Sequence, residues 1–206
     1  MAIDIGAHTG DSTIPIALAV GAAGCVIALE PNPLVFPVLD RNAGLNIDKA
    51  RIIPLMFAAT AESGEFDFGY SDAGFCNGGM HEGISRWRHG HMFKLRVHGH
   101  NLQRYLEKQY PDLMNRIRFI KVDTEGHDYR VLASLEGLLV AVKPVLKAEM
   151  FALLDGAGRE RLFDFVTGLG YDVFITQNDA DYPGRRLHRS ELCARRHYDV
   201  FCVPKS

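Results

Sequence analysis

The sequence predicts an α/β fold with a doubly wound, mostly parallel sheet and an antiparallel hairpin at its C-terminal edge. Short apolar runs alternate with helical patterns along the whole chain, which is typical of repeated strand–helix units. The first five runs are continuously apolar, as expected for strands that are covered by helices on both faces. A polar segment without a convincing helical pattern joins the last two runs, so we expect these two strands to pair antiparallel.

The expected elements follow in chain order. Strands are expected at residues 2–5, 25–29, 51–58, 117–122, 145–150, 171–176 and 198–203, and helices at residues 12–20, 32–45, 128–139 and 158–169. Asn32 and Pro33 have the residue types of an N-cap and a first helical position, whereas Pro37 is expected to kink the same helix. The Gly- and His-rich stretch 62–101 predicts an irregular insertion within a single domain of residues 1–206.

Composition argues against several classes of function. The chain has 23 Lys and Arg against 25 Asp and Glu, a net charge of −2, which is unlike a protein that grips nucleic acid or an anionic membrane. No apolar run approaches the ~18 residues that are needed to cross a bilayer, and the start of the chain is not typical of a signal peptide. The four cysteines stand far apart, which indicates free thiols, so we expect a cytoplasmic protein.

The first strand is followed by a glycine turn that is typical of a nucleotide site. Gly6 and Gly10 give the spacing G-x-x-x-G, which lacks the middle glycine of the dinucleotide fingerprint. Asp4 precedes the turn and would suit a positively charged ligand end, while Glu30 ends the second strand, where an acid can accept ribose hydroxyls. A tight turn with a capping acid is the alternative, but together these residues favour a nucleoside site.

Several blocks of the chain resemble the FkbM family of S-adenosylmethionine-dependent methyltransferases. The resemblance rests on residues 4–10 (DIGAHTG), 28–33 (ALEPNP), 77–78 (NG), 120–126 (IKVDTEG) and 147–149 (KAE), in this order. It implies the Rossmann-like class I methyltransferase fold and S-adenosylmethionine as cofactor, with S-adenosylhomocysteine as product. It also implies O-methylation of a small hydroxylated metabolite, such as a sugar or a polyketide-like natural product.

The resemblance also implies roles for individual residues. The methionine end of the cofactor would be held by Asp4, Gly6, Ala7 and Gly10, and the adenosine by Glu30, Pro31, Asn32, Ala58 and Asn77. Ala58 could equally be small for packing, and Asn77 could equally be a turn residue, because Asn-Gly is a common turn dipeptide.

Four residues are candidates for catalysis. Asp123, Glu125 and His127 follow the fourth strand, where a carboxylate or an imidazole can accept the proton of an acceptor hydroxyl. Glu149, at the end of the neighbouring strand, is expected to orient the substrate or to support the other groups. The alternative for the two acids after the fourth strand is that they cap the next helix.

Metal and nucleic acid are not predicted as partners. The pairs His89/His91 and His98/His100, with His81 nearby, have chelating spacing, but a solvated loop is favoured because no cysteine pair supports a zinc site. Asp123 and Glu125 could bind a hard divalent cation, which is possible but not predicted. Arginines within residues 184–197 suit either an anionic acceptor or a solvated loop, and no interleaved aromatic residues indicate nucleic acid.

Two alternatives to an active methyltransferase remain open. The chain starts almost inside its first strand, whereas family members usually have upstream residues that close over the site. It could therefore be a cofactor-binding but inactive module. A nicotinamide-dependent oxidoreductase that uses Glu30 is the other alternative, and the missing middle glycine weakens it.

Overall fold

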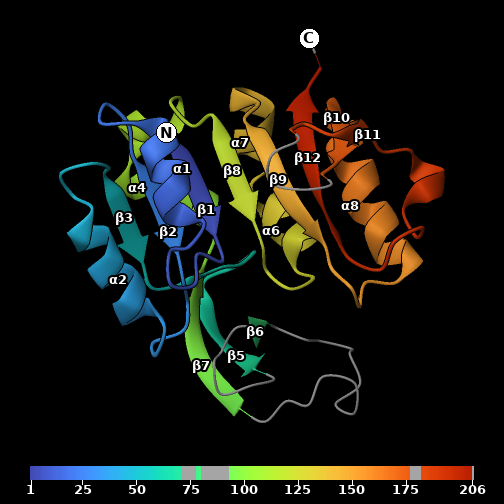
Figure 1. Cartoon of the computed structure of the whole chain (residues 1–206). Coiled ribbons are helices and arrows are strands. Elements are labelled where there is room, and N and C mark those ends of the chain that lie inside the picture. The colour runs from blue at the N-terminus through green and yellow to red at the C-terminus, as the bar shows by residue number, and fades with distance from the viewer. Residues whose placement is uncertain (71–77, 80–92, 177–181, 206) are drawn as a thin grey trace.

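The computed structural model describes residues 1–70, 78–79, 93–176 and 182–205. Its main sheet contains the strands β1 (Ala2–Ile5), β2 (Val26–Leu29), β3 (Ile52–Leu55), β8 (Phe119–Val122), β9 (Val145–Met150), β10 (Tyr171–Ile175), β11 (Arg185–Arg186) and β12 (Tyr198–Pro204). Their order across the sheet is β11-β10-β12-β9-β8-β1-β2-β3 (Figure 1). The first strand thus lies near the middle of the sheet.

The strand directions confirm the expected fold class. Strands β3, β2, β1, β8 and β9 are parallel neighbours, and β12 pairs antiparallel with both β9 and β10. The expected antiparallel pair of C-terminal strands is therefore present, but β12 lies between β9 and β10 rather than at the edge. The edge is formed by β11, which no sequence pattern predicted.

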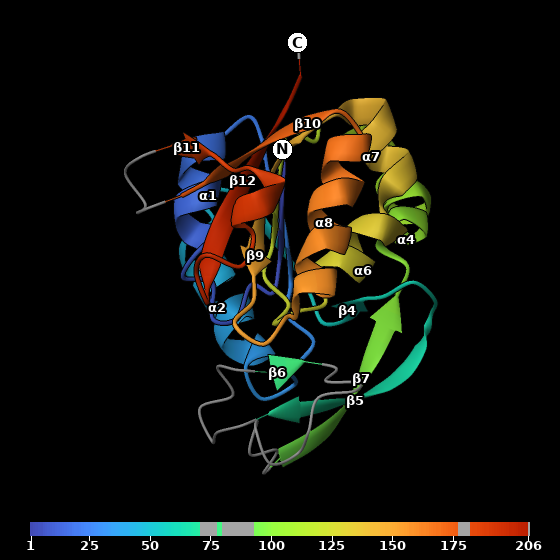
Figure 2. The ribbon, with the colours of Figure 1, turned by 90° about the vertical axis from the view of Figure 1, so that its right-hand side faces the viewer.

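Helices cover the two faces of the sheet unequally. Helices α1 (Thr13–Val20) and α2 (Phe36–Leu45) lie on one face. The opposite face is covered by α4 (Leu102–Gln109), α6 (Asp128–Ser134), α7 (Glu136–Val142) and α8 (Gly156–Gly168), as the edge-on view shows (Figure 2). The short helix α5 (Pro111–Met114) follows α4.

The alternation of side chains along β1 decides which residues face α1. Ile3 and Ile5 belong to the large core cluster that also contains buried residues of α4, α6, α7 and α8. Ala2, on the other face, packs with Ala17 of α1 in a small cluster of small side chains. Because successive strand residues point to opposite faces, Asp4 lies on the α1 side with Ala2.

A second, smaller sheet lies beyond the carboxyl ends of the main parallel strands (Figure 1). It consists of β4 (Ala58–Ala59), β5 (Gly64–Tyr70), β6 (Gly78–Gly79) and β7 (Phe93–His100) in the order β4-β7-β5-β6, and β5 pairs antiparallel with β7 over its whole length. The described parts of the stretch 62–101 are thus more regular than expected. The apolar run 51–58 is also divided, because β3 ends at Leu55 and Ala58 pairs with Gly99 of β7.

Two helix predictions need correction, and one helix was not predicted. The helix expected from Asn32 begins at Phe36, because the Asn32 side chain accepts the N–H of Leu34 in a turn, and Pro37 therefore lies in the first turn without kinking the helix. The helix expected at 128–139 is divided at Leu135 into α6 and α7. Helix α4 was not expected, although the Asn101 side chain caps it by accepting the N–H of Arg104.

Candidate active site

A cavity of about 440 Å³ opens at the carboxyl ends of β1, β2 and β8, where doubly wound sheets bind their ligands. Of the residues singled out from the sequence, its lining includes Gly6, Glu30, Pro31, Ala58, Asp123, Glu125 and His127. The lining does not include five others, which are buried: Asp4, Ala7, Gly10, Asn32 and Glu149. Asn77 lies outside the described residues.

The glycine turn brings the end of β1 against the end of β8. Gly6 has a φ of +81°, and a Cβ atom built on it would lie 2.0 Å from the carbonyl oxygen of Asp123. Gly10 has a φ of +96° and lies against Leu39 of α2. Only glycine adopts such conformations at little cost, so the sequence pattern is explained by backbone geometry. The close contact places the β1 turn and Asp123 at the same wall of the cavity.

Glu30 is oriented by two backbone hydrogen bonds. Its Oε2 accepts the N–H of His8 at 3.0 Å and its Oε1 accepts the N–H of Asn32 at 2.8 Å. Burial raises the pKa of Glu30, and these hydrogen bonds partly oppose the shift. Because each carboxylate oxygen has two acceptor sites, both oxygens can still accept hydroxyl donors from the cavity.

Asp4 lies behind the cavity wall. Its side chain is fully buried, and Oδ2 accepts hydrogen bonds from Ser12 Oγ at 2.8 Å and Thr13 Oγ1 at 2.6 Å. Its Oδ1 faces Lys121 Nζ at 3.4 Å. Asp4 therefore ties the start of α1 to the sheet, and its carboxylate meets a lysine.

Lys121 is a site residue that the sequence analysis missed. It lines the cavity, and its Nζ lies 3.2 Å from Asp123 Oδ2 and 3.4 Å from Asp4 Oδ1. Burial lowers the pKa of Lys121, but the two carboxylates raise it more, so the net shift is upward and the group is a cation at neutral pH. The signal in the sequence was the i, i+2 spacing of Lys121 and Asp123, which points both side chains to the same side while the chain stays extended past the end of β8.

Three further carboxyl groups lie close together where β8 and β9 end. Burial, followed by the nearby charges of Asp123 and Asp128, raises the pKa of Glu125 to about 7. The pKa of Asp128 is also raised to about 7 by burial, although Asp128 accepts hydrogen bonds from Thr124 and from the N–H of Glu149. Burial and the surrounding carboxylates raise the pKa of Glu149 to about 9.

Glu149 has a partner that the sequence did not indicate. His197, just before β12, places its Nε2 3.1 Å from Glu149 Oε1, and its side chain is half exposed. The loop that carries His197 is held by the buried Arg159, which donates to the carbonyl oxygens of Leu192, Arg195 and Arg196. A buried arginine of α8 thus holds the loop that places His197 beside Glu149.

Comparison with known proteins identifies the family. The model of the methyltransferase FkbM domain matches residues 4–173, which is most of the chain. This chain belongs to the FkbM methyltransferase family. The match spans the glycine turn, Glu30 and the block 120–126 at the end of β8, and it supports methyl transfer in general. It gives no support to a nicotinamide-dependent oxidoreductase.

Solved structures of other methyltransferases share the fold. The FkbM methyltransferase from Methylobacillus flagellatus KT is similar with a TM-score of 0.61 and 14% identity over 98% of this chain, and this chain spans 43% of its length. Fibrillarin from Aeropyrum pernix, with bound S-adenosyl-L-methionine, has a TM-score of 0.51 at 10% identity over 98% of this chain and 65% of its own. An rRNA methylase from Streptococcus thermophilus has a TM-score of 0.50 at 11% identity over 100% of this chain and 86% of its own. A search of curated proteins found no significant match.

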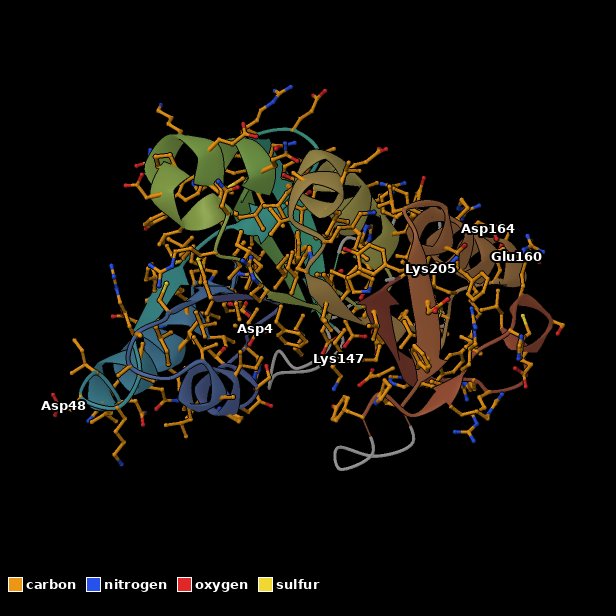
Figure 3. All side chains as sticks on the ribbon, turned by 90° about the horizontal axis from the view of Figure 1, so that it is seen from above. Asp4, Asp48, Lys147, Glu160, Asp164 and Lys205 are labelled. Atoms are coloured by element: carbon orange, nitrogen blue, oxygen red, sulfur yellow. The ribbon has the colours of Figure 1, made fainter. Side chains whose placement is uncertain are left out.

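Three arginines near the C-terminal end of this FkbM chain, Arg185, Arg186 and Arg189, form ion pairs with acids. Arg185 pairs with Glu191 and Arg186 with Asp172. Arg189 contacts Glu160 and Asp164 of α8, which lie at the end of the molecule remote from Asp4 (Figure 3). The side chains of these three arginines are about half exposed and already have acidic partners, which favours the solvated loop over a site for an anionic acceptor.

The remaining expectations concern metal ions and the membrane. Among the described residues, no group of three or more His, Cys, Asp or Glu is arranged to hold a metal ion. His98 and His100 are on β7, whereas His81, His89 and His91 lie outside the described residues. Within the described part of this FkbM chain, no helix is long and apolar enough to span a membrane.

Proposed function

We propose that this chain binds S-adenosylmethionine and transfers its methyl group to a hydroxyl of a small metabolite. The observation that supports this most directly is the convergence of Glu30, the Gly6 turn and the Asp123–Glu125 segment on one cavity. Its volume lies within the ~300–1,000 Å³ that is usual for small-molecule sites.

The residues of the cavity fit this cofactor. Glu30 offers two carboxylate oxygens to the ribose hydroxyls, and Gly6 lines the same cavity at the turn that packs against the Asp123 carbonyl. Pro31, Phe57 and Ala58 line the same cavity and suit an apolar adenine face. When bound, S-adenosylmethionine supplies an electrophilic methyl group.

Glu125 is the best candidate for the base that accepts the hydroxyl proton. A general base is most effective when its pKa lies near the working pH, and the pKa of Glu125 is raised to about 7. Asp123 lines the same wall but is paired with Lys121. His127, the residue just before α6, also lines the cavity. Much of the remaining rate enhancement would come from holding the acceptor oxygen in line with the bond between the sulfonium and its methyl group.

The acceptor class is proposed from charge. The net charge is −2, and three arginines near the C-terminus, Arg185, Arg186 and Arg189, are paired with acids, which reduces the attraction to a phosphate backbone. This supports a small, hydroxylated acceptor such as a sugar or a natural product.

Binding of S-adenosylhomocysteine, measured by isothermal titration calorimetry, tests the proposed cofactor. We expect Glu30→Ala to weaken binding at least tenfold, because two ribose hydrogen bonds are lost. Glu107→Gln is the matched control, since Glu107 is exposed on α4. No binding to the unmodified chain would refute the proposal.

Methyl transfer is then measured as S-adenosylhomocysteine release across a panel of hydroxylated acceptors. Turnover that Glu125→Gln reduces at least a hundredfold, with cofactor binding unchanged, supports the proposed base. Binding without turnover on any acceptor would instead support the inactive module.

A further inference from the structure

A lysine and two carboxylates form the wall of the cavity beside the glycine turn. Lys121 Nζ lies 3.4 Å from Asp4 Oδ1, 3.2 Å from Asp123 Oδ2 and 3.5 Å from the carbonyl oxygen of Gly6. Lys121 and Asp123 line the cavity, whereas Asp4 is fully buried behind them. The group that the cavity offers next to Asp123 is therefore a cation.

This arrangement reverses the charge that the sequence suggested at this position. Both oxygens of Asp4 already face protein groups, namely Ser12, Thr13 and Lys121. The contacts of Lys121 are longer than the ~2.7–2.9 Å of a tight charge-assisted hydrogen bond. Because its three present contacts are all long, the ammonium can share one of its N–H donors with a carboxylate in the cavity.

We propose that Lys121 binds the carboxylate of the cofactor's methionine end and that Asp123 binds its ammonium group. The methionine end is a zwitterion, and Lys121 and Asp123 present the two opposite charges 3.2 Å apart. The start of α1 adds positive potential, since Ser12 lines the same cavity. This inference rests on the proposed function, because it assumes that the cofactor occupies the cavity.

The charges of the wall match those of the whole cofactor. Asp4, Lys121 and Asp123 together carry one negative charge when all three are ionised. S-adenosylmethionine carries one positive charge beyond its zwitterion, on the sulfonium. Asp4 therefore contributes indirectly, by holding Lys121 beside the Gly6 carbonyl.

Three ligands separate the two contacts by isothermal titration calorimetry. S-adenosylhomocysteine has both the carboxylate and the amine, S-adenosyl-3-thiopropylamine has only the amine, and 5′-methylthioadenosine has neither. We expect Lys121→Met to weaken the binding of S-adenosylhomocysteine at least tenfold. The affinities for the other two ligands are expected to change less than twofold. Asp123→Asn is expected to weaken both amine-bearing ligands at least fivefold and to leave 5′-methylthioadenosine unchanged.

Lys147→Met is the matched control for Lys121→Met. Lys147 lies directly opposite Lys121 in the register of β8 and β9, pairs with Asp199 and is not part of the cavity lining. We expect this variant to bind all three ligands as the unmodified chain does.

A second variant keeps the test valid if Lys121→Met does not fold. Lys121→Met leaves the Asp4 carboxylate buried without its cation, which is strongly destabilising. The double variant Asp4→Asn/Lys121→Met removes both charges, and circular dichroism with thermal unfolding shows whether each variant folds. We expect the folded double variant to lose at least tenfold in affinity for S-adenosylhomocysteine only.

The outcomes distinguish this inference from the function on which it rests. If the unmodified chain binds none of the three ligands, the proposed function is refuted together with the inference. If it binds them, but the double variant keeps full affinity for S-adenosylhomocysteine or loses affinity for all three ligands equally, only the role of Lys121 is refuted.

Discussion

Replacing Glu149 with glutamine is expected to reduce the dependence of stability on pH. Glu149 is buried, and Asp123, Asp128, Glu125 and Asp199 surround it with further carboxyl groups. Burial and these charges raise its pKa to about 9, against about 4.3 in an unfolded chain. Between these two pKa values, Glu149 holds a proton in the folded state that it has lost in the unfolded state. The free energy of unfolding therefore falls as the pH rises through this range.

The slope of the free energy of unfolding against pH follows from the number of protons that the folded state binds in excess of the unfolded state. One extra proton in the folded state lowers the free energy of unfolding by about 1.4 kcal/mol for each pH unit of increase. Between pH 5.5 and pH 7.5, Glu149 alone is therefore expected to lower the free energy of unfolding by about 3 kcal/mol. Glu125 and Asp128, whose pKa values are about 7, add to the slope on the acid side of this window. Glutamine resembles the protonated carboxyl and does not titrate, so Glu149→Gln is expected to remove about 1.4 kcal/mol per pH unit.

Urea denaturation at several pH values between 5.5 and 7.5 measures these slopes. Glu107→Gln is the control, because it removes an exposed carboxylate of α4, and it is expected to keep the slope of the unmodified chain. Equal slopes for Glu149→Gln and the unmodified chain would show that Glu149 is ionised in the folded protein. The reasoning from burial would then be wrong.

Three further predictions concern stability and are measured by the same urea titrations at one pH. Gly6→Ala is expected to cost about 3 kcal/mol or more, since φ is +81° and the new Cβ meets the Asp123 carbonyl, whereas Gly44→Ala, in α2 with open space around it, should be neutral or stabilising. Equal effects of the two glycine substitutions would contradict the assigned turn. Asp155→Ala is expected to cost about 1 kcal/mol, because the Asp155 side chain caps α8, and an unchanged midpoint would show that this cap contributes nothing. Arg159→Met is expected to cost at least about 2 kcal/mol, because buried carbonyl groups lose their donor, and a smaller loss would mean that water replaces the guanidinium.

Local patterns in the sequence predicted the parts of the site that depend on neighbouring residues. The glycines of the first turn are set by the backbone conformation of that turn, and the structure gives Gly6 and Gly10 positive φ values. Glu30 directly follows β2, at the edge where the parallel strands end, and it lines the cavity as expected of a residue there. The roles of these residues in binding and catalysis stay predictions.

Element boundaries were less well predicted where a local pattern allowed two outcomes. Asn32 and Pro33 have the residue types of a helix start, yet the Asn32 side chain forms a turn and α2 begins four residues later. The apolar run after Arg51 continues past Leu55, but its last residues pair with β7, which lies some forty residues further along the chain. Pairing with a distant strand leaves no signal in the run itself.

The sequence by itself determined the alternation of strands and helices, the glycine turn and the position of an acid at the end of β2. Only the tertiary structure decided which charges meet. The register of β1 and β8 sets Asp4 beside Lys121, so that an acid expected to bind a ligand is neutralised by a lysine of another strand. In the same way, β12 brings His197 to Glu149 from about fifty residues away. Strand register and burial are properties of the folded sheet, and they fix both the contacts and the protonation of these groups.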